Sequence, residues 1–298
     1  MRVDNAQLAA FSAVIREGSF EGAARKLHVT ASAVSQRIKQ LEDRLGQVLV
    51  LRGSPCEATP AGKTLLRFTE QIDFLESELF HDLGVFGDEL GMESRLPIVV
   101  NVDSLDGWFL NVMESVCDDS FITFDVRIED QDYSAALLRE GAVMAAVSGS
   151  PVAVQGCRVE FLGNMRYLAL ASPLFQSKYF SNGVGFESLS SAPMLVFNRK
   201  DDTQHDFVRA LISQEIAPPV HCLPTSHSFI EAIRRGFGWG MAPEDMVRSH
   251  MEAGVLVDIT PGQYLDVPLY WHSWRFNSKN LEKLSSIVRE CAKKYLRS

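Results

Sequence analysis

The stretch from Ser19 to Gly46 constrains this chain more than any other, because it predicts two short helices joined by a tight turn. The second helix has one apolar face, formed at helical spacing by Val34, Ile38, Leu41 and Leu45. A different face of the same helix carries small or polar side chains: Ser32, Ser35, Gln36 and Lys39. A helix that is buried on one face and can hydrogen-bond on another fits the major groove of DNA. The pattern therefore predicts a helix-turn-helix that contacts DNA.

Any helical domain contains amphipathic helix pairs, so the pattern alone does not identify a DNA-binding pair. The distribution of charge along the chain makes that distinction. Residues 1–67 hold ten Lys and Arg against six Asp and Glu, a net charge of +4. The whole chain has a net charge of −9, so residues 68–298 carry −13. A basic module on an acidic body is expected when only one part of a protein meets nucleic acid. A nonspecific architectural DNA protein is disfavoured, because a net charge of only +4 is concentrated in this module.

Length and composition set the broad class of the protein. The chain has 298 residues, of which 46% are hydrophobic, enough for two or three domains with their own cores. The N-terminal residues show no signal-peptide pattern, and no run of about 18 apolar residues occurs. We therefore expect a cytoplasmic protein with no membrane span. Five scattered cysteines without a CxxC pair indicate reduced thiols and no structural zinc site.

The N-terminal part reads as a winged helix-turn-helix followed by a linker. A helix is expected over residues 4–17, and a short β-type run (VLVLR, 48–52) with a turn-rich tip follows the helix pair. We assign residues 1–60 to this all-α winged domain. Residues 61–95 form the linker, a long amphipathic helix that ends near Leu83 and a Gly-containing hinge. The apolar stripe of this helix favours a partner helix, and hence a homodimer or a homotetramer.

From Leu96 onward, β-type runs alternate with helical patterns, which predicts βαβ units and a parallel sheet. A second series of strands and helices follows, and the last strand and helix are expected to return to the first lobe. The predicted fold of residues 96–298 is therefore α/β with two lobes. We place lobe I at about 96–165 and 267–298, and lobe II at about 166–266.

Residues 27–52 (LHVTASAVSQRIKQLEDRLGQVLVLR) resemble the DNA-binding signature of LysR-type transcriptional regulators, through helix, turn, recognition helix and wing. The two α/β lobes match the periplasmic-binding-protein-like effector domain of this family, a fold that binds ligands in the cleft between its lobes. The resemblance implies a ligand-responsive regulator. Its implied partners are double-stranded operator DNA, a small-molecule effector, further copies of itself and RNA polymerase.

The expected DNA contacts come from the recognition helix and the base of the wing: Ser32, Ser35, Gln36, Arg37, Lys39 and Arg52. Of these, Arg37 and Arg52 are expected to contact phosphate. Two positions depart from the family's pattern. Glu57 stands where relatives carry a basic residue, and because a carboxylate repels phosphate we expect no backbone contact there. Ala31 stands where relatives often have Gln or Pro, which removes one frequent base-reading side chain.

The effector half resembles the branch of the family that regulates export of basic amino acids (LysG and ArgP). The matching stretches are VNVDSLDGWF (100–109), DVRIEDQDYSAALLREG (125–141), IRRGFGWGMAPE (233–244) and DVPLYWHSW (266–274). The resemblance implies lysine, arginine or a related amino acid as effector, and an exporter gene as the target that is activated. The alternative within the family is a regulator that senses a different small metabolite.

Candidate effector-binding side chains are the hydroxyls and acids expected where strands end and helices begin: Asp103, Ser104, Glu129, Asp130, Ser148, Thr225 and Ser226. Backbone N–H groups at a helix start, with a Ser hydroxyl, suit an α-carboxylate. The acids suit an ammonium group or a basic side chain. For any single Ser, a simple helix N-cap is the alternative interpretation. Asp201 and Asp202, in a polar loop, are candidates of second rank.

Motifs of catalysis and cofactor binding are missing from the sequence. It has no HExxH, no GxSxG, no GxGxxG after an N-terminal strand and no P-loop, and its seven histidines show no metal spacing. We therefore expect no enzyme activity, no cofactor and no metal. The alternative from a different class is a cytosolic solute-binding or enzyme module with an accessory DNA-binding domain.

Overall fold

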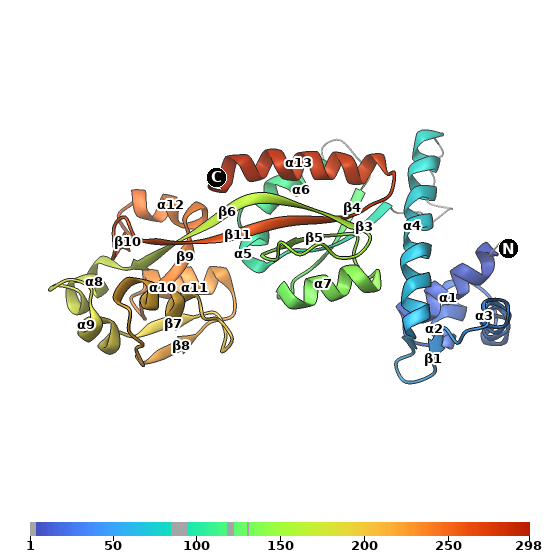
Figure 1. Cartoon of the computed structure of the whole chain (residues 1–298), viewed down its shortest axis with the longest axis horizontal. Coiled ribbons are helices and arrows are strands. Elements are labelled where there is room, and N and C mark those ends of the chain that lie inside the picture. Colours follow the sequence, from blue (N-terminus) through green and yellow to red (C-terminus); the bar gives the residue numbers. More distant parts are fainter. Residues whose placement is uncertain (1–3, 85–93, 118–121, 130) are drawn as a thin grey trace.

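The computed structural model describes residues 4–84, 94–117, 122–129 and 131–298. In Figure 1 the chain forms three parts in a row: an N-terminal helical domain, a middle lobe, and a second lobe at the far end. The helix α4 (Pro60–Asp82) stands between the N-terminal domain and the middle lobe. Two long strands, β6 (Cys157–Ala171) and β11 (Tyr264–Trp274), run from the middle lobe into the far one.

The N-terminal domain consists of three helices and a two-stranded wing: α1 (Asn5–Glu17), α2 (Phe20–Lys26), α3 (Ala31–Leu45), β1 (Val50–Leu51) and β2 (Glu57–Ala58). Two hydroxyls cap the predicted helix pair. That of Ser19 accepts from the backbone N–H of Gly22, and that of Thr30 accepts from Ala33. Gly46 takes a left-handed conformation (φ 67°) and ends α3. The winged helix-turn-helix expected from the sequence is therefore present.

The core of this domain lies where its three helices meet. The predicted apolar face of α3 is covered, fully at Val34, Ile38 and Leu41 and partly at Leu45. These side chains share one hydrophobic cluster with Phe11 and Val14 of α1 and with Ala23 of α2. Because Ala23 is small, α2 and α3 can cross closely. Burial of this face leaves the polar face of α3 on the outside of the domain.

The helix α4 begins directly after the wing, which confirms the long helix expected in the linker. The hydroxyl of Thr59 accepts a hydrogen bond from the backbone N–H of Gly62, and Pro60 occupies the first turn, where no N–H is needed. A Cβ at Gly62 would lie 2.2 Å from the carbonyl oxygen of Leu49, so only glycine fits there. Residues 85–93 of the expected hinge lie outside the described residues.

Lobe I, the middle part in Figure 1, is built on three parallel strands flanked by helices. Its elements are β3 (Ser94–Val99), α5 (Val102–Asp106), α6 (Phe109–Cys117), β4 (Ile122–Arg127), α7 (Gln131–Glu140), β5 (Ala145–Ser148) and α13 (Lys279–Tyr295). β3 pairs in parallel with both β4 and β5, as the βαβ pattern predicts. Three fully buried rings, those of Trp108, Phe109 and Trp271, lie in its core.

Lobe II surrounds the other ends of the long strands. Its elements are α8 (Pro173–Tyr179), α9 (Phe186–Ser191), β7 (Met194–Val196), α10 (Thr203–Ile212), β8 (Val220–Cys222), α11 (Ser226–Arg234), β9 (Gly240–Pro243), α12 (Glu244–Glu252) and β10 (Val257–Asp258). Met194, Phe207 and Trp239 belong to its core. The sequence did not predict α8 and α9, which are too short to show helical periodicity.

One expected helix differs from the structure. The pattern of residues 103–116 predicts a continuous helix, but the chain breaks at Gly107 into α5 and α6. The break lies at a contact with lobe II. A Cβ at Gly107 would lie 2.8 Å from a carboxylate oxygen of Asp245, which is on α12. Lobe II therefore approaches lobe I at this break, and local helical periodicity does not report such a contact.

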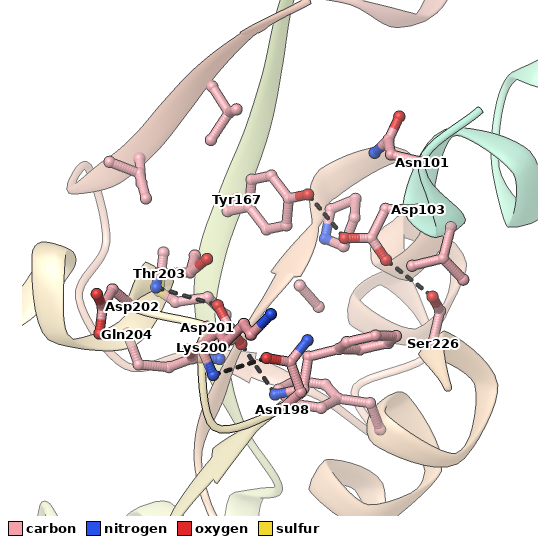
Figure 2. A pocket seen from close by; sticks show the side chains of 18 of the residues that line it. Asn101, Asp103, Tyr167, Asn198, Lys200, Asp201, Asp202, Thr203, Gln204 and Ser226 are labelled. Carbon is pink, nitrogen blue, oxygen red and sulfur yellow. Dashed lines mark hydrogen bonds between the residues drawn. The ribbon is translucent and has the colours of Figure 1, made fainter. Parts of the chain in front are cut away.

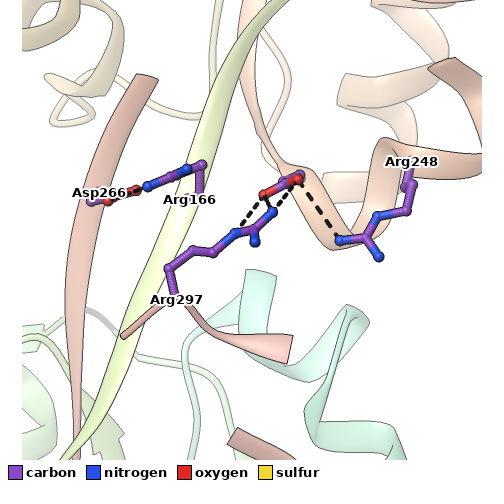
Figure 3. A network of polar contacts seen from close by, with 5 residues as sticks. Arg166, Arg248, Asp266 and Arg297 are labelled. Carbon is purple, nitrogen blue, oxygen red and sulfur yellow. Dashed lines mark hydrogen bonds and ion pairs between the residues drawn. The ribbon is translucent and has the colours of Figure 1, made fainter. Parts of the chain in front are cut away.

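The strands β6 and β11 pair antiparallel along their length and join the two lobes into one sheet, in the order β10-β6-β11-β5-β3-β4. Figure 3 shows a side-chain link across them, in which the guanidinium of Arg166 donates two hydrogen bonds of 2.8 Å to Asp266. Arg297, which follows α13, donates to Glu244 on α12. The strand β11 also pairs with β5, and α13 packs in the core of lobe I.

Candidate nucleic-acid interface and interlobe cavity

The polar face of α3 is open to solvent. Five of the six predicted DNA contacts lie on this helix: Ser32, Ser35, Gln36, Arg37 and Lys39. Ser32 shares a hydrogen bond of 3.0 Å with the N-cap residue Thr30. Among the described residues, Gln36 and Lys39 have exposed side chains without a hydrogen bond or ion pair. These two side chains are therefore free to meet a groove, and their contacts with DNA stay a prediction.

The sixth predicted contact, Arg52, lies at the base of the wing directly after β1. Its side chain is exposed, and its guanidinium carbon lies 5.1 Å from the centroid of the Phe20 ring. This cation–π contact holds a positive charge beside the first helix of the pair. Glu57, where no phosphate contact is expected, is exposed on β2, and Ala31 packs at the edge of the hydrophobic core.

A cavity of about 700 Å³ lies between the two lobes. Lobe I contributes the ends of β3 and β4 together with α5, lobe II contributes the loop from β7 to α10 and the start of α11, and the long strands contribute Tyr167, Leu265 and Val267. Figure 2 labels ten of the lining residues: Asn101, Asp103, Tyr167, Asn198, Lys200, Asp201, Asp202, Thr203, Gln204 and Ser226. Small-molecule sites are typically about 300–1,000 Å³, so this cavity has the size of a ligand site.

The charged groups of the cavity are mostly acidic. Five carboxylates line it: Asp103, Glu129, Asp201, Asp202 and Asp206. Within the described part of the lining, Lys200 is the only Lys or Arg. A concave surface with an excess of one sign of charge raises the local concentration of the opposite sign. The cavity therefore favours a ligand with net positive charge.

Asp103 is almost enclosed and connects the two lobes. One of its carboxylate oxygens accepts a hydrogen bond of 2.7 Å from the hydroxyl of Tyr167, and the other accepts one of 2.8 Å from Ser226 (Figure 2). Burial raises the pKa of this carboxyl, the two hydrogen bonds lower it, and the nearby charges of Asp201 and Asp106 raise it further. Since Asp103 is on α5 and Ser226 on α11, their hydrogen bond ties lobe I to lobe II across the cavity.

Two amide side chains of the lining have buried oxygens without a partner. In the described residues, neither Oδ1 of Asn101 nor Oε1 of Gln204 accepts a hydrogen bond. An unsatisfied buried acceptor destabilises a fold by roughly 1–3 kcal/mol. Both oxygens are enclosed by the protein itself, so the property of the lining that bears on the ligand is its charge.

Asp201 is held in place by its own loop. Its two carboxylate oxygens accept backbone hydrogen bonds of 2.8 Å from Phe197 and 3.1 Å from Thr203. These bonds shape the loop between β7 and α10 and fix the carboxylate at the cavity wall. Asp202 makes no capping hydrogen bond to α10 and is exposed. The acids that the sequence placed in second rank thus both belong to the lining.

The structure brings together part of the predicted effector site. Asp103, Glu129 and Ser226 line the cavity, and Asp130 lies outside the described residues. Ser104, Ser148 and Thr225 are not in the lining, and a contact between these residues and an effector stays a prediction.

The three residues outside the lining have local roles. The hydroxyl of Thr225 caps α11 by accepting from the backbone N–H of Ser228 at 3.3 Å, which is the N-cap alternative. The hydroxyl of Ser148 accepts from the backbone N–H of Ser150 in the turn after β5. Ser104 is fully enclosed within lobe I. A strand end therefore identifies the region of a cleft, and side-chain direction decides which residue faces it.

Sequence reasoning missed Asn101, Tyr167, Lys200 and Gln204. Asn101 adjoins a predicted strand end two residues before Asp103, so the signal that identified Asp103 could have included it. Tyr167 lies in a strand, and the sequence pattern of a strand is the same whether a residue lines a cavity or packs in a core. Gln204 is an ordinary polar residue in the first turn of α10. No local pattern distinguishes it from a solvated side chain.

Two further features are absent from the described ranges. These contain no group of three or more His, Cys, Asp and Glu residues arranged to hold a metal ion. None of the helices in the same ranges combines the length and apolarity needed to cross a membrane.

Two family models match the chain. The bacterial regulatory helix-turn-helix protein of the lysR family matches residues 6–63, and the LysR substrate binding domain matches residues 111–293. The transcriptional regulator LysG of Mycobacterium tuberculosis is 45% identical over 291 residues, which are 98% of this chain and 94% of that protein.

Two solved structures resemble the whole chain. ArgP from Mycobacterium tuberculosis superposes with a TM-score of 0.87 at 44% identity, and the match covers 100% of both chains. Full-length LysG from Corynebacterium glutamicum with the bound effector Arg superposes with a TM-score of 0.79 at 35% identity. That match covers 99% of this chain and 100% of the other.

The substitution Asp103→Asn tests the electrostatics of the cavity. The pKa of Asp103 is higher in the folded state than in the unfolded state, so the folded protein holds this proton more tightly. Its contribution to the free energy of unfolding is therefore fully present below the unfolded-state pKa, and it is lost as pH rises through the folded-state pKa. Asn keeps the shape and can both accept and donate a hydrogen bond. We expect D103N to be more stable than the wild type at about pH 8, with a gain that shrinks toward about pH 4, near the pKa of an unfolded Asp.

Thermal melts of both proteins across this pH range measure the difference. Asp43→Asn, which removes an exposed acid from α3, controls for the loss of one charge. A gain that does not grow with pH would contradict the raised pKa of Asp103.

Proposed function

This chain belongs to the lysR family of bacterial helix-turn-helix regulators, and on that premise we propose that its effector is a basic amino acid. It is a ligand-responsive, DNA-binding regulator of transcription, and its relatives are transcriptional regulators. In our proposal, lysine, arginine or a related amino acid occupies the interlobe cavity. The regulator, acting in the cytoplasm together with RNA polymerase and without enzyme activity of its own, then activates an amino-acid exporter gene.

The observation that carries this proposal is the charge of the cavity. Five carboxylates face it against one lysine, Lys200. Lysine and arginine each bring two cationic groups and one carboxylate at neutral pH, so their net charge opposes that of the lining. Lys200 and the backbone N–H groups at the start of α11 suit the effector's single carboxylate.

A solved relative supports the same effector class. LysG of Corynebacterium glutamicum has been solved with the effector Arg bound, and it shares 35% identity with nearly the whole of this chain. A neutral or anionic metabolite, the alternative effector class, would leave most of the carboxylates of the cavity unpaired. No specific observation favours a solute-binding or enzyme module with an accessory DNA-binding domain.

The exposed face of α3 is the proposed DNA-reading surface. In a helix-turn-helix, the second helix enters the major groove, and two copies contact half-sites about 34 Å apart. Gln36 and Lys39 extend from the exposed face, so they are placed to contact bases or adjacent phosphates. Arg37 and Arg52 are proposed phosphate contacts, while Ser32 and Ser35 lie against the groove.

The helix α4 supplies the proposed dimer contact. Four exposed apolar side chains lie at helical spacing on the face opposite the buried Phe74 and Ser77: Phe68, Leu75 and Leu79 of α4, and Leu83 directly after it. The partly buried Ile72 continues this stripe. A long apolar stripe on a helix is covered by a second helix in most soluble proteins. We propose that α4 of a second copy covers it, which also sets the spacing of two α3 helices.

Effector choice is tested by thermal stabilisation with matched ligands. L-arginine and L-lysine should stabilise the protein, by roughly 2.7 kcal/mol at a concentration of 100 Kd. L-citrulline and L-norleucine, which have similar size without the side-chain charge, should have little effect. Glu129→Gln should weaken arginine binding by about 10- to 150-fold, since a hydrogen bond to a charged group contributes about 1.5–3 kcal/mol.

Glu114→Gln, which removes an exposed acid of α6 outside the lining, is the matched control and should leave arginine binding unchanged. Equal stabilisation by citrulline, or a response only to another metabolite, would refute a basic amino acid as effector.

DNA reading is tested with Gln36→Ala on an operator selected from a random-sequence library. A good base contact contributes about 1–3 kcal/mol of discrimination. We therefore expect a loss of that size in specific binding, with weak nonspecific binding retained, in gel shifts at fixed salt. Gln47→Ala, an exposed glutamine beyond the end of α3, should bind as the wild type does. An equal loss on random DNA would mean that Gln36 only positions the backbone.

The dimer contact is tested with Leu79→Glu, at a leucine whose side chain is 54% exposed. A charge buried in an apolar helix contact is strongly unfavourable, so we expect the variant to sediment as a smaller species than the wild type. Val48→Glu, at an exposed valine before the wing, should sediment as the wild type does. An unchanged sedimentation coefficient for Leu79→Glu would exclude this stripe as the dimer contact.

A further inference from the structure

The helix α7 begins beside the cavity and ends against α4. Ile128 and Glu129, which line the cavity, precede α7 at its N-terminal end, and Gly141 follows its last residue, Glu140. Glu140 forms an ion pair with Lys63 on α4. Both of these side chains are about 40% exposed, so their ion pair contributes little by itself. It does show that the far end of α7 meets the linker helix.

The contact at Gly141 is tighter, because it joins backbone to backbone. Gly141 has φ +82°, and a Cβ placed on it would lie 2.6 Å from the Cβ and 2.7 Å from the Cα of Arg67 on α4. A residue with a side chain meets two obstacles there, since the left-handed conformation and the close approach both require glycine. The end of α7 therefore touches α4 with no compressible side chain between them.

The side chain of Arg67 extends the same contact. Its guanidinium donates a hydrogen bond of 3.2 Å to the carbonyl oxygen of Gln155. A Cβ on Gly156 would lie 2.7 Å from the same guanidinium. The half-buried Arg67 therefore lies against two glycines of lobe I, and closely packed backbone of this kind transmits a displacement because it cannot absorb it.

The helix α4 also contacts the N-terminal domain, through ion pairs. The guanidinium of Arg16 on α1 lies 2.7 Å from the carboxylate of Glu70 and 3.3 Å from that of Asp73, both on α4. One helix thus carries contacts to the DNA-reading domain and to the end of α7. A displacement of α7 at Gly141 is passed to α4, and from α4 to α1 and the rest of the helix-turn-helix.

From this geometry we propose that the contact between Gly141 and Arg67 couples effector binding to DNA binding. The proposal rests on the proposed function and names the regulation of the same cavity. An effector that contacts Glu129 favours one position of α7, and the contact at Gly141 converts that position into an orientation of α4. Gly141 and Arg67 act as positioning residues, since neither lines the cavity. A ligand shifts such an equilibrium only by its differential affinity for the two positions.

The test is Gly141→Ala, with L-arginine as the probe and two measurements on each protein. Coupling between two sites typically changes affinity about 5- to 150-fold. In the wild type we expect arginine to change operator affinity within that range. In Gly141→Ala the added Cβ separates α7 from α4, so we expect the change to disappear while the Kd for arginine, measured by calorimetry, stays the same.

Gly262→Ala is the matched control for backbone strain. Gly262 has nearly the same φ, +85°, and a Cβ there meets nothing within 4 Å. This variant should keep the full response of operator affinity to arginine. Arg67→Ala is the second coupling variant, because it removes the enclosed side chain without adding an atom to Gly141. It should reduce the response and keep arginine binding, and it tests the proposal if Gly141→Ala does not fold.

The outcomes separate this proposal from the proposed function. If the wild type does not bind arginine, lysine or a related amino acid, the proposed effector is wrong and the coupling has nothing to transmit. If the wild type binds and responds, and Gly141→Ala or Arg67→Ala responds equally, the coupling proposal is overturned while the effector stands. A loss of response in both coupling variants, with arginine binding intact and Gly262→Ala normal, supports the proposal.

Discussion

β6 and β11 cross from one lobe to the other as a paired ribbon, and both cores are built against it (Figure 1). Met165 and Trp271 of the ribbon are buried in the core of lobe I, while Ala169 is buried in lobe II. The cavity lies beside the ribbon, where Tyr167 forms part of its wall. Because the ladder of hydrogen bonds runs through both lobes, they share one rigid element. A change in the angle between the lobes must therefore come from bending or twisting of this ribbon.

The cavity has an energetic cost that the two cores offset. Burial raises the pKa of Asp103, and it also raises the pKa of Asp245, which lies at the contact between the lobes. The oxygens of Asn101 and Gln204 have no partner among the described residues. Groups of this kind oppose folding. A cationic effector would offset the repulsion among the carboxylates of the cavity. The free energy of binding can in this way favour one arrangement of the lobes.

Regulation requires that the cavity and the DNA-reading helix belong to one mechanical system. The hydrogen bond from Ser226 to Asp103 holds the lobes together at the cavity. On the other side of lobe I, the tight contact at Gly141 and the ion pairs of Arg16 hold α4 between the effector half and the helix-turn-helix. These contacts differ in kind. The hydrogen bond from Ser226 to Asp103 lies at the cavity, where a ligand can replace it, whereas the contact at Gly141 and the ion pairs of Arg16 lie away from the cavity. The first is suited to sensing and the others to transmission.

The sequence by itself determined the helix-turn-helix, the linker helix and the alternation of strands and helices. These depend on local periodicity, on caps such as Ser19 and on where charge is concentrated, all of which short segments record. It also identified Asp103, Glu129 and Ser226 as candidates, because strand ends converge in an α/β fold. Only the tertiary structure decided that Ser104, Ser148 and Thr225 face elsewhere, that Gly107 breaks a helix, and that Tyr167 and Gln204 join the cavity. The physical reason is that cavity walls and tight glycine contacts arise between segments distant in sequence, whose approach no local pattern encodes.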